Sequence, residues 1–500
     1  MVASHKTQLA TYAVVGSVRH AEYSTALVAM LLLSGCLDQQ QRAEEAPGAP
    51  DEPLDKWHYD AAGTLLPLPS DVQETTVILT GERGLTRGEP SIGMLDDGTV
   101  FTNAWDLTLR SLDRGETWAV VQDFDLGLPL TSASLTRSGD PYLWVDRDDG
   151  RVYVDHLYGG CNTLLWSEDA GDTWTRRDLA CTSPFVDHQK LASGPPGVSD
   201  NPFVTSTTER VIYLCYSKVA SSNCAMSYDR GMTWPAETVV TVAYEPEMGS
   251  VTTPAQSGTC SALNGQPVVS SEGVVALPRT MGCDGLYIHT SQDSGLSWQA
   301  ATALTGVGGE GLDPDLAFDA DGNLYALWQG GDHQKYLAIT RDLGKTWEGP
   351  WRVSPPHLTS TEFQTIAIDG RGRIAVAFLG TTDTSEAPGH APADTRWHLY
   401  IVTTAFAANG PDTFVAYRVT PEGDPAHVGC TVAPFTAEGY AGTFPCENLG
   451  EFIDSTMAPD GSYLVSFTDG CTEGCAGHPD ATLEDSQDTQ TAVAWLSPGR

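Results

Sequence analysis

The sequence predicts an all-β protein, a single β-propeller built of four-stranded antiparallel blades. Three observations support this fold: an eight-residue turn motif recurs five times, alternating apolar strands precede most copies, and no helical period appears between them. Repeated short strands without helices are typical of propellers, in which each unit buries its faces against its neighbours. We expect seven blades, with six as the alternative.

The turn motif reads Ser/Thr-x-Asp-x-Gly-x-Thr/Ser-Trp, and its copies begin 49 to 64 residues apart. The aspartate can accept hydrogen bonds from the turn backbone, and the glycine supplies the permissive backbone that the turn requires. The tryptophan starts the next strand and buries a large apolar surface. The motif therefore predicts a hairpin turn held by its own side chains. Its aspartates and tryptophans are Asp113 and Trp118, Asp169 and Trp174, Asp229 and Trp234, Asp293 and Trp298, and Asp342 and Trp347.

A second repeat combines an acidic residue, an alternating strand, a tight turn and an apolar strand, which together predict a hairpin. If two weaker copies shared a blade, the ring would have six blades instead of seven. Residues 75–79 are expected to pair with residues 491–496 and close the ring, which removes exposed sheet edges. Clear copies start at Glu89, Asp140, Asp313, Glu362 and Glu451, and weaker ones near Asp187 and Gly265.

The N-terminal residues predict an export signal. Residues 25–33 are mostly apolar but too short to cross a bilayer, which needs about twenty residues, and Ser34-Gly35-Cys36 follows them. Small residues before a cysteine resemble the bacterial lipobox, in which the cysteine is acylated. We therefore expect a lipoprotein signal peptide at 1–35, lipidation of Cys36, a flexible acidic linker at 36–70 and the propeller at 71–500. A soluble secreted protein is the alternative.

Of the eleven cysteines, Cys36 is assigned to the lipid, and ten remain. They lie in near pairs along the chain, which favours disulfides formed between neighbours in an oxidising compartment. A zinc site is the alternative for the last pair, but no CxxC or histidine at metal spacing accompanies it. The expected pairs are Cys161/Cys181, Cys215/Cys224, Cys260/Cys283, Cys430/Cys446 and Cys471/Cys475.

The formal net charge of −38 excludes several classes of partner. A nucleic-acid binder needs a basic face to displace counterions from phosphates, and a polybasic membrane-surface protein needs the same. We expect a monomer outside the cytoplasm whose ligand is a glycan or a protein at the propeller face. Contact with the bacterial membrane or cell surface is expected only through the lipid anchor.

The five turn motifs resemble the Asp-box, also called the bacterial neuraminidase repeat. This repeat occurs in sialidases, in a class of xyloglucan hydrolases, in sortilin-type receptors and in photosystem assembly factors. The resemblance covers most of the chain from Glu89 to Trp347 and implies a sialidase-like propeller. It implies no activity, because in these families the box lies on the outer strands, and a shared fold does not bring its chemistry with it.

A sialidase of this kind needs three arginines for the substrate carboxylate, a tyrosine nucleophile with a glutamate partner, and an aspartate acid/base. The family's first arginine lies in an Arg-Ile-Pro sequence; Arg87 is the nearest match, but an extra residue and an acid follow it. Arg279 is a candidate second arginine and Tyr440 a candidate nucleophile, whereas Arg352 and Arg418 are possible third arginines outside any motif. The alternative is that these arginines form surface or interblade ion pairs.

The acidic residues at the unit starts are expected to lie near the mouth of the central channel. A ring of carboxylates should repel sialic acid. It could instead act on a neutral glycan through paired carboxylates, bind Ca²⁺, or simply cap the inner strands. No other cofactor is expected, and His188 is interpreted as a satisfied polar residue. The candidate binding residues are Glu89, Asp140, Asp187, Asp313, Asp315, Glu362 and Asp454.

Two hypotheses for function follow. The favoured one is noncatalytic recognition of a glycan or protein at the cell surface, because no complete catalytic set can be assembled from the sequence. The alternative is a glycoside hydrolase, which would be either sialidase-like or active on neutral polysaccharide.

Overall fold

The computed structural model describes residues 55–69, 77–82, 89–123, 141–158, 161–179, 186–198, 200–218, 221–242, 263–280, 283–300, 303–369, 372–407, 410–431, 446, 449–471, 475, 477–478, 480–482 and 489–497. Cys36, Arg87, Asp140 and Tyr440 lie outside these residues. The described elements are β-strands and one short 3-10 helix, η2 (Pro388–His390), so the all-β prediction is confirmed. In this part of the chain, no helix is long and apolar enough to span a membrane.

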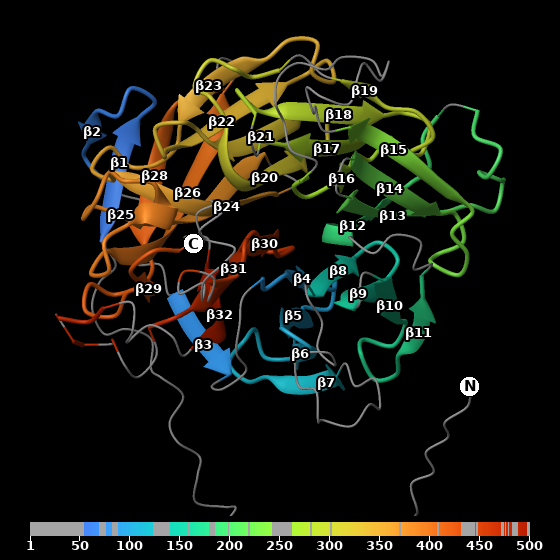
Figure 1. Ribbon diagram of the computed structural model, residues 1–500, viewed down its shortest axis with the longest axis horizontal. Helices are drawn as coiled ribbons and strands as arrows, with labels where there is room; N and C mark the ends of the chain where they lie inside the picture. The colour runs from blue at the N-terminus through green and yellow to red at the C-terminus, as the bar shows by residue number, and fades with distance from the viewer. Residues whose placement is uncertain are drawn as a thin grey trace, which may run out of the picture. The chain divides into compact units, whose positions relative to one another are not determined.

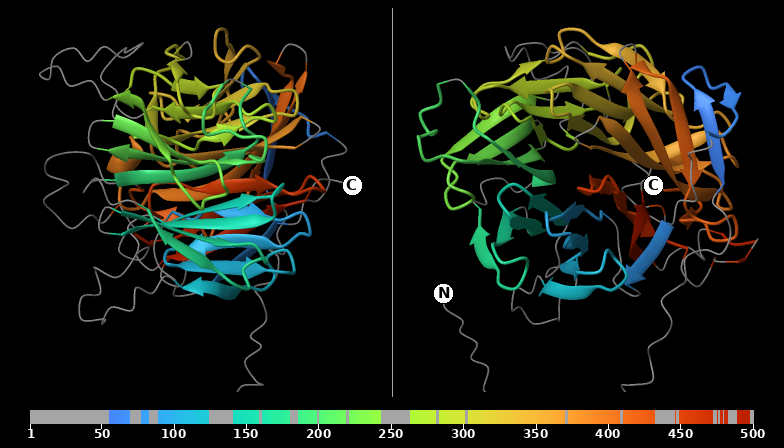
Figure 2. Two further views of the ribbon diagram at one scale, coloured as in Figure 1. Left: turned by 90° about the vertical axis from the view of Figure 1, so that its right-hand side faces the viewer. Right: turned by 180° about the vertical axis from the view of Figure 1, so that it is seen from behind.

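Seven sheets form a ring in the unit Pro47–Arg500, and their inner strands surround its centre (Figures 1 and 2). Six of the sheets are four-stranded blades, and in each of them the strands follow one another from the inner to the outer side of the ring. Blade 1 contains β4 (Ile92–Met94), β5 (Val100–Ala104), β6 (Leu107–Ser111) and β7 (Ala119–Asp123). Blade 2 contains β8 (Pro141–Asp146), β9 (Arg151–Tyr158), β10 (Cys161–Ser167) and β11 (Thr175–Asp178). Blade 3 contains β12 (Val186–Gly194), β13 (Val211–Lys218), β14 (Ser221–Ser227) and β15 (Ala236–Val242).

Three further four-stranded blades and one larger sheet complete the ring. Blade 4 contains β16 (Val268–Val269), β17 (Val275–Arg279), β18 (Tyr287–Ser291) and β19 (Gln299–Ala300). Blade 5 contains β20 (Glu310–Phe318), β21 (Leu324–Gln329), β22 (Lys335–Thr340) and β23 (Glu348–Arg352). The closing blade contains β30 (Asp454–Met457), β31 (Tyr463–Asp469), β32 (Gln490–Leu496) and β3 (Val77–Glu82). The eight-stranded sheet contains β24 (Ser360–Ile368), β25 (Arg373–Thr381), β26 (Arg396–Ala407), β28 (Thr413–Arg418), β1 (Lys56–Asp60), β2 (Leu65–Leu66), β27 (Gly410–Pro411) and β29 (His427–Val428).

The ring closes as the sequence predicts. β3 pairs with β32, so a strand from near the start of the propeller joins the last blade. Each inner strand contacts the inner strand of the next sheet around the ring, and β30 of the closing blade contacts β4 of blade 1. We expected seven four-stranded blades, with six as the alternative. The described chain has six such blades, and the eight-stranded sheet occupies the remaining place between blade 5 and the closing blade.

Residues 56–66 were expected in a flexible linker, and this expectation is wrong. They form β1 and β2, and β1 pairs with β28 at the outer side of the eight-stranded sheet. Tyr59 explains the position of β1, because its side chain is only 1% exposed and its hydroxyl donates a 2.5 Å hydrogen bond to the Val353 carbonyl. Burial of this ring favours a strand over a free tether.

The repeated turns in blades 1 to 5 are held by their own side chains, as predicted. In blade 3, Asp229 accepts hydrogen bonds from the Thr233 amide at 2.7 Å and the Thr233 hydroxyl at 2.5 Å. Ser227 Oγ accepts the Gly231 amide at 2.8 Å, and Gly231 has a φ of 90° that favours glycine. The other four copies repeat these bonds.

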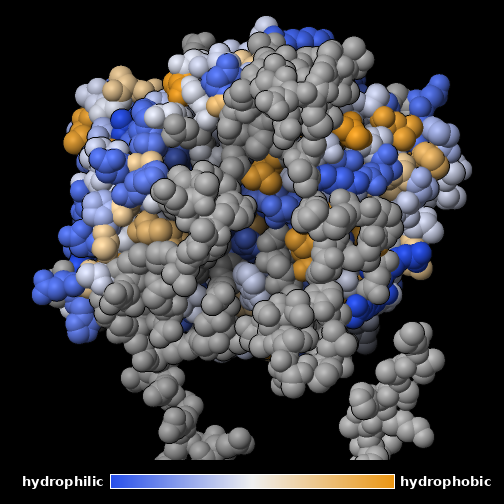
Figure 3. Space-filling view, viewed as in Figure 1, coloured by the Kyte–Doolittle hydropathy of each residue, from blue (hydrophilic) through white to orange (hydrophobic). Residues whose placement is uncertain are grey.

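Apolar clusters lie between neighbouring sheets, as a ring of stacked units requires. Leu164 and Trp166 of blade 2 pack with Ile212 and Leu214 of blade 3, and similar clusters join the other sheets. On the coloured part of the face in Figure 3, hydrophilic residues are interspersed with small hydrophobic areas. The core therefore lies between the sheets.

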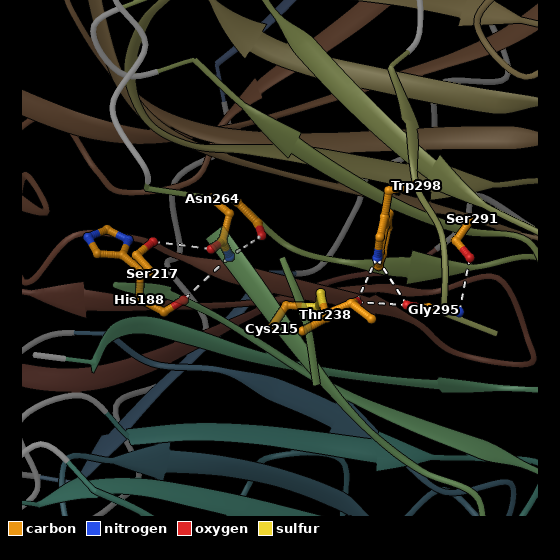
Figure 4. The surroundings of a disulfide bond; sticks show 10 residues. His188, Cys215, Ser217, Thr238, Asn264, Ser291, Gly295 and Trp298 are labelled. Atoms are coloured by element: carbon orange, nitrogen blue, oxygen red, sulfur yellow. Dashed lines mark hydrogen bonds between the residues drawn. A yellow bond between two sulfur atoms is a disulfide. The ribbon is translucent and has the colours of Figure 1, made fainter. Parts of the chain in front are cut away.

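Three of the expected disulfides are present. Cys215–Cys224 joins the adjacent strands β13 and β14 (Figure 4), and Cys430–Cys446 and Cys471–Cys475 also form. The last of these confirms the disulfide interpretation of Cys471 and Cys475 over a zinc site. The other two expected pairs include Cys181 and Cys260, which lie outside the described residues.

Candidate functional site

The site begins where inner strands of the ring start. At these starts β12, β20 and β24 contain β-bulges, and non-glycine residues adopt positive φ: 50° at His188, 48° at Asp313 and 48° at Phe363. Such conformations are disfavoured for non-glycine residues and persist only when their surroundings stabilise them. Bulges redirect side chains, and these bulges accompany a cluster of charged groups in the channel.

Four residues form this charged cluster. His188 Nδ1 lies 3.3 Å from Asp313 Oδ1, and Lys190 Nζ lies 3.2 Å from Asp313 Oδ2. His188 Nε2 also contacts the Glu451 carboxylate. The side chains of His188, Lys190 and Asp313 are 4%, 3% and 8% exposed, whereas Glu451 is 37% exposed. The charged cluster is therefore buried except at Glu451.

Opposite charges decide how this cluster titrates. Burial by itself lowers the pKa of His188, but the Glu451 and Asp313 carboxylates outweigh it and hold this pKa well above its usual value. Burial by itself raises the pKa of Asp313, but Lys190 and His188 outweigh it and lower this pKa. At neutral pH, His188 is therefore an imidazolium and Asp313 a carboxylate, and they lie beside Lys190 and Glu451.

Aromatic and amide side chains close the channel beside the charged cluster. Lys190 Nζ lies 2.8 Å from the Phe452 ring centroid and 5.0 Å from that of Tyr142. The Tyr142 hydroxyl contacts the Gln266 side-chain oxygen. The remaining cavity among these side chains has a volume of about 10 Å³, room for about one water molecule. The channel is plugged at this level.

Asp315 and Asp454 join neighbouring sheets. Asp315 accepts a 2.8 Å hydrogen bond from the Ile366 amide of the eight-stranded sheet and another from the amide that follows it in β20. Asp454 accepts the Ile92 amide of blade 1 at 3.0 Å and the amide that follows it in β30 at 2.8 Å. Burial raises the pKa of Asp315 to about 7 and that of Asp454 to about 6, and these hydrogen bonds oppose the shift.

Another buried lysine lies between blade 5 and the eight-stranded sheet. The Lys335 side chain is fully buried, and its Nζ donates to the side-chain oxygens of Gln329 at 2.5 Å and Gln364 at 2.6 Å. Gln329 in turn donates to the Glu362 carboxylate at 3.4 Å. Burial lowers the pKa of Lys335 to about 7, and the charge of Glu362 opposes this shift.

A larger cavity lies along the channel beside the plug. It has a volume of about 360 Å³ and extends from Asp315 and Asp454 to the opposite ends of the inner strands at Met94, Phe318 and Ile368. Charged groups at that end are paired, because Arg210 donates to both carboxylate oxygens of Asp146 at 2.7 and 2.9 Å. In the part of the chain that the structure describes, no group of three or more His, Cys, Asp or Glu residues is arranged to hold a metal ion.

The predicted acids do gather at the starts of the inner strands, but not as an exposed acidic ring. Glu89, Asp315 and Glu362 are 6%, 7% and 3% exposed, and Asp187 is the one exposed residue among the candidate acids that the structure describes. Buried lysines neutralise part of this charge. Chain position alone could not show this, because hydrogen bonds and paired cations in the fold allow the acids to be buried.

The structure does not bring the described candidate arginines together. Arg279 is 3% exposed at the end of β17, its guanidinium carbon 5.8 Å from the Tyr287 ring centroid, and burial lowers its pKa to about 10. Arg352 lies on the outer strand of blade 5 and donates to the Pro355 and Leu358 carbonyls. Arg418 lies on β28 and pairs with Asp55 at 2.5 Å. These contacts agree with the alternative of surface or interblade pairing, and the role of Arg352 or Arg418 as a third arginine stays a prediction.

Several residues of the site were not predicted from the sequence. Lys190 directly follows Asp187-His188-Gln189, a segment that the sequence had indicated as the start of a unit. Nothing in this segment showed that both His188 and Lys190 would be buried. The dipeptide Glu-Phe occurs at both 362–363 and 451–452, which was a signal that Glu451 and Phe452 belong to the channel. Lys335 and Gln364 carried no comparable signal.

Comparisons with known proteins give fold-level similarities at low identity. No protein-family model matches the sequence, and no curated protein matches it. A protein of unknown function from Dyadobacter fermentans is 12% identical, with 84% of this chain and 97% of that chain covered and a TM-score of 0.41. A mutant Aleuria aurantia lectin bound to α-methyl-L-fucoside is 13% identical, with 69% and 99% covered and a TM-score of 0.40. A mutant NanB sialidase from Streptococcus pneumoniae is 13% identical, with 84% and 70% covered and a TM-score of 0.39. At these values, the similarities do not identify a function.

Proposed function

We propose that this chain is an exported propeller that recognises a glycan at the mouth of its channel without hydrolysing it. One observation supports this most strongly: the carboxylates nearest the channel are occupied in holding the fold. Asp315 and Asp454 each accept backbone amides from two sheets, and Asp313 is paired with His188 and Lys190. A carboxyl group that holds sheets together is poorly placed to exchange a proton with a substrate.

The expected glycan is neutral. Asp187 is an exposed acid beside the charged cluster, and Glu451 is the most exposed member of that cluster. Carboxylates accept hydrogen bonds from sugar hydroxyls. The net charge of −38 repels anionic sugars such as sialic acid. A cationic protein ligand fits the same charges, but it makes less use of fixed hydrogen-bond acceptors.

A glycoside hydrolase is the second candidate, and one observation favours it. Asp315 and Asp454 line the same cavity of about 360 Å³, with pKa values of about 7 and 6. A raised pKa suits a general acid, and a pair of carboxyl groups is what glycoside hydrolysis requires. Arg87 and Tyr440 would belong to the sialidase form of this candidate.

Binding by the mature chain tests the proposal. A glycan array followed by calorimetry is expected to find neutral glycans that bind, and Asp187→Asn is expected to weaken binding by about tenfold because a charge-assisted hydrogen bond is lost. Glu348→Gln, which changes an exposed glutamate of blade 5 paired with Arg341, serves as the matched control. A preference for sialylated glycans, or the same affinity in the Asp187→Asn variant, would contradict the proposal.

We also propose that the chain is anchored by a lipid at Cys36 and that the turn motifs are Asp-boxes. The disulfides are consistent with an oxidising compartment. In a bacterial host, the full chain is expected to incorporate labelled palmitate and to partition with membranes, whereas Cys36→Ser is expected to do neither. Membrane association that is retained in the Cys36→Ser variant would exclude this anchor.

A further inference from the structure

Among the described contacts, the interface between blades 2 and 3 lacks the indole hydrogen bond that joins blade 2 to blade 1 and blade 4 to blade 3. In blade 2, Trp174 Nε1 donates to the Val121 carbonyl of blade 1 at 3.0 Å. In blade 4, Trp298 Nε1 donates to the Thr238 hydroxyl of blade 3 at 3.0 Å (Figure 4). The equivalent Trp234 of blade 3 donates to the carbonyl of Gly231 in its own turn at 3.2 Å, its one hydrogen bond among the described contacts. No described hydrogen bond joins this indole nitrogen to blade 2.

A cavity of about 130 Å³ occupies this place. Its apolar walls include Leu179 of blade 2 and Leu214 and Trp234 of blade 3. Ala225 and Ala236 also line it, and their small side chains leave space that larger residues would fill. The cavity therefore presents an aromatic ring and aliphatic side chains to whatever enters it.

Asn162 supplies an unpaired polar group in this cavity. Asn162, Leu164 and Trp166 alternate on one face of β10, so all three face blade 3. Leu164 and Trp166 pack into the apolar core between the blades, but Asn162 lines the cavity, where it is 5% exposed. Its Oδ1 is buried and has no hydrogen-bond partner among the residues that the structure describes. Unsatisfied buried acceptors are rare, and a ligand hydroxyl would satisfy this one.

The polar rim of the cavity carries no net charge. Lys218 Nζ lies 2.5 Å from Glu237 Oε1, and Asn223 donates to the same oxygen at 3.0 Å. Both Lys218 and Glu237 line the cavity. Because the two charges neutralise each other, the rim favours an uncharged ligand with hydroxyl groups over an anion or a cation.

We propose that this cavity binds a single neutral pyranose ring. The apolar face of the ring packs against Trp234 and the leucines, and one hydroxyl donates to Asn162 Oδ1. Other hydroxyls meet the Lys218–Glu237 pair at the rim. A volume of about 130 Å³ has room for one ring but not for a longer oligosaccharide. This interblade sugar site is separate from the channel mouth and does not depend on the function proposed for it.

Titration of the full chain with monosaccharides tests the interblade sugar site. The probes are the methyl glycosides of glucose, galactose, mannose and N-acetylglucosamine, with that of N-acetylneuraminic acid as the anionic comparison, followed by calorimetry and saturation-transfer NMR. At least one neutral glycoside is expected to bind, with a Kd on the order of millimolar. Asn162→Leu and Glu237→Gln are each expected to weaken this binding by about tenfold.

Two control variants distinguish this site from the channel mouth. Glu348→Gln changes an outer-strand glutamate of blade 5 that is paired with Arg341, as Glu237 is paired with Lys218. Asp187→Asn changes the channel mouth. Glu348→Gln is not expected to alter binding of the neutral glycoside at either site, whereas Asp187→Asn is expected to weaken only the binding at the channel mouth and to leave the affinity of the interblade sugar site unchanged. If Asn162→Leu fails to fold, Glu237→Gln, which changes a rim residue, provides the test.

Three results would overturn the interblade sugar site. The first is that no neutral glycoside binds, and the second is that the sialoside binds more tightly than the neutral ones. The third is that affinity falls with Asp187→Asn but not with Glu237→Gln, which would place the sugar at the channel mouth.

Discussion

Asp313→Asn is expected to lower the free energy of unfolding by about 3–5 kcal/mol, the cost of leaving buried charges without their partner. Asp313 lies 3.2 Å from Lys190 Nζ and 3.3 Å from His188 Nδ1, and both cationic side chains are less than 5% exposed. Asparagine keeps the shape of the side chain but removes its negative charge. Urea unfolding, monitored by tryptophan fluorescence, measures the change.

Glu348→Gln is the matched control for this variant. Glu348 and Arg341 also form an ion pair, at 3.0 Å, but their side chains are 44% and 42% exposed. Exposed pairs contribute about 0–1 kcal/mol because water screens them. If Asp313→Asn costs no more than this control, the charged cluster does not stabilise the fold as described.

Acidification is the second change with a large expected effect, because buried histidines are neutral in the fold. Burial lowers the pKa of His156 and His289 to about 3 and that of His398 and His427 to about 4. The unfolded chain protonates these four histidines below a pH of about 6.5. Between pH 4.5 and 6, the unfolded chain therefore binds about four protons at these histidines that the folded chain does not bind.

Three buried carboxyl groups act in the opposite direction. Burial raises the pKa of Asp315 to about 7 and that of Asp454 and Asp469 to about 6. The fold therefore binds up to three protons that the unfolded chain has released. Four minus three leaves about one proton in favour of the unfolded state. The pKa of the partly buried His357, which burial lowers to about 4, acts in the same direction, so stability rises with pH.

The free energy of unfolding is expected to increase between pH 4.5 and 6 by roughly 1–1.5 kcal/mol per pH unit. Urea unfolding at several pH values measures the slope. His427→Gln is expected to flatten it, because His427 is fully buried and accounts for about one of the four protons. A slope of the opposite sign would mean that the carboxyl groups outweigh the histidines.

Local sequence signals predicted most of the fold. Each turn motif contains the aspartate, glycine and tryptophan that hold its own hairpin, so five turns could be located without any long-range information. The closing strand pair was also visible as two short apolar runs. β1 was missed because its strand pattern is short and its partner β28 lies more than 350 residues later in the chain.

The site was less predictable than the fold because its contacts join distant residues. His188 and Asp313 are 125 residues apart in the chain, and the Asp454 carboxylate accepts an amide 362 residues away. The sequence showed that acids recur at the unit starts. It could not show that Lys190 and Lys335 would be buried among them, because a lysine carries no sequence mark of burial. His188 and Lys190 pair with Asp313, so the channel holds a mixed-charge cluster instead of an exposed acidic ring.

Hydrolysis of fluorogenic glycosides by the mature chain tests recognition without catalysis most directly. The panel combines a sialoside with neutral glycosides, and release of the fluorophore is compared with that in buffer and with denatured chain. Recognition without catalysis predicts no release above either background. Turnover by the folded chain that is lost in Arg87→Ala, Asp315→Asn or Asp454→Asn variants of unchanged fold would contradict it.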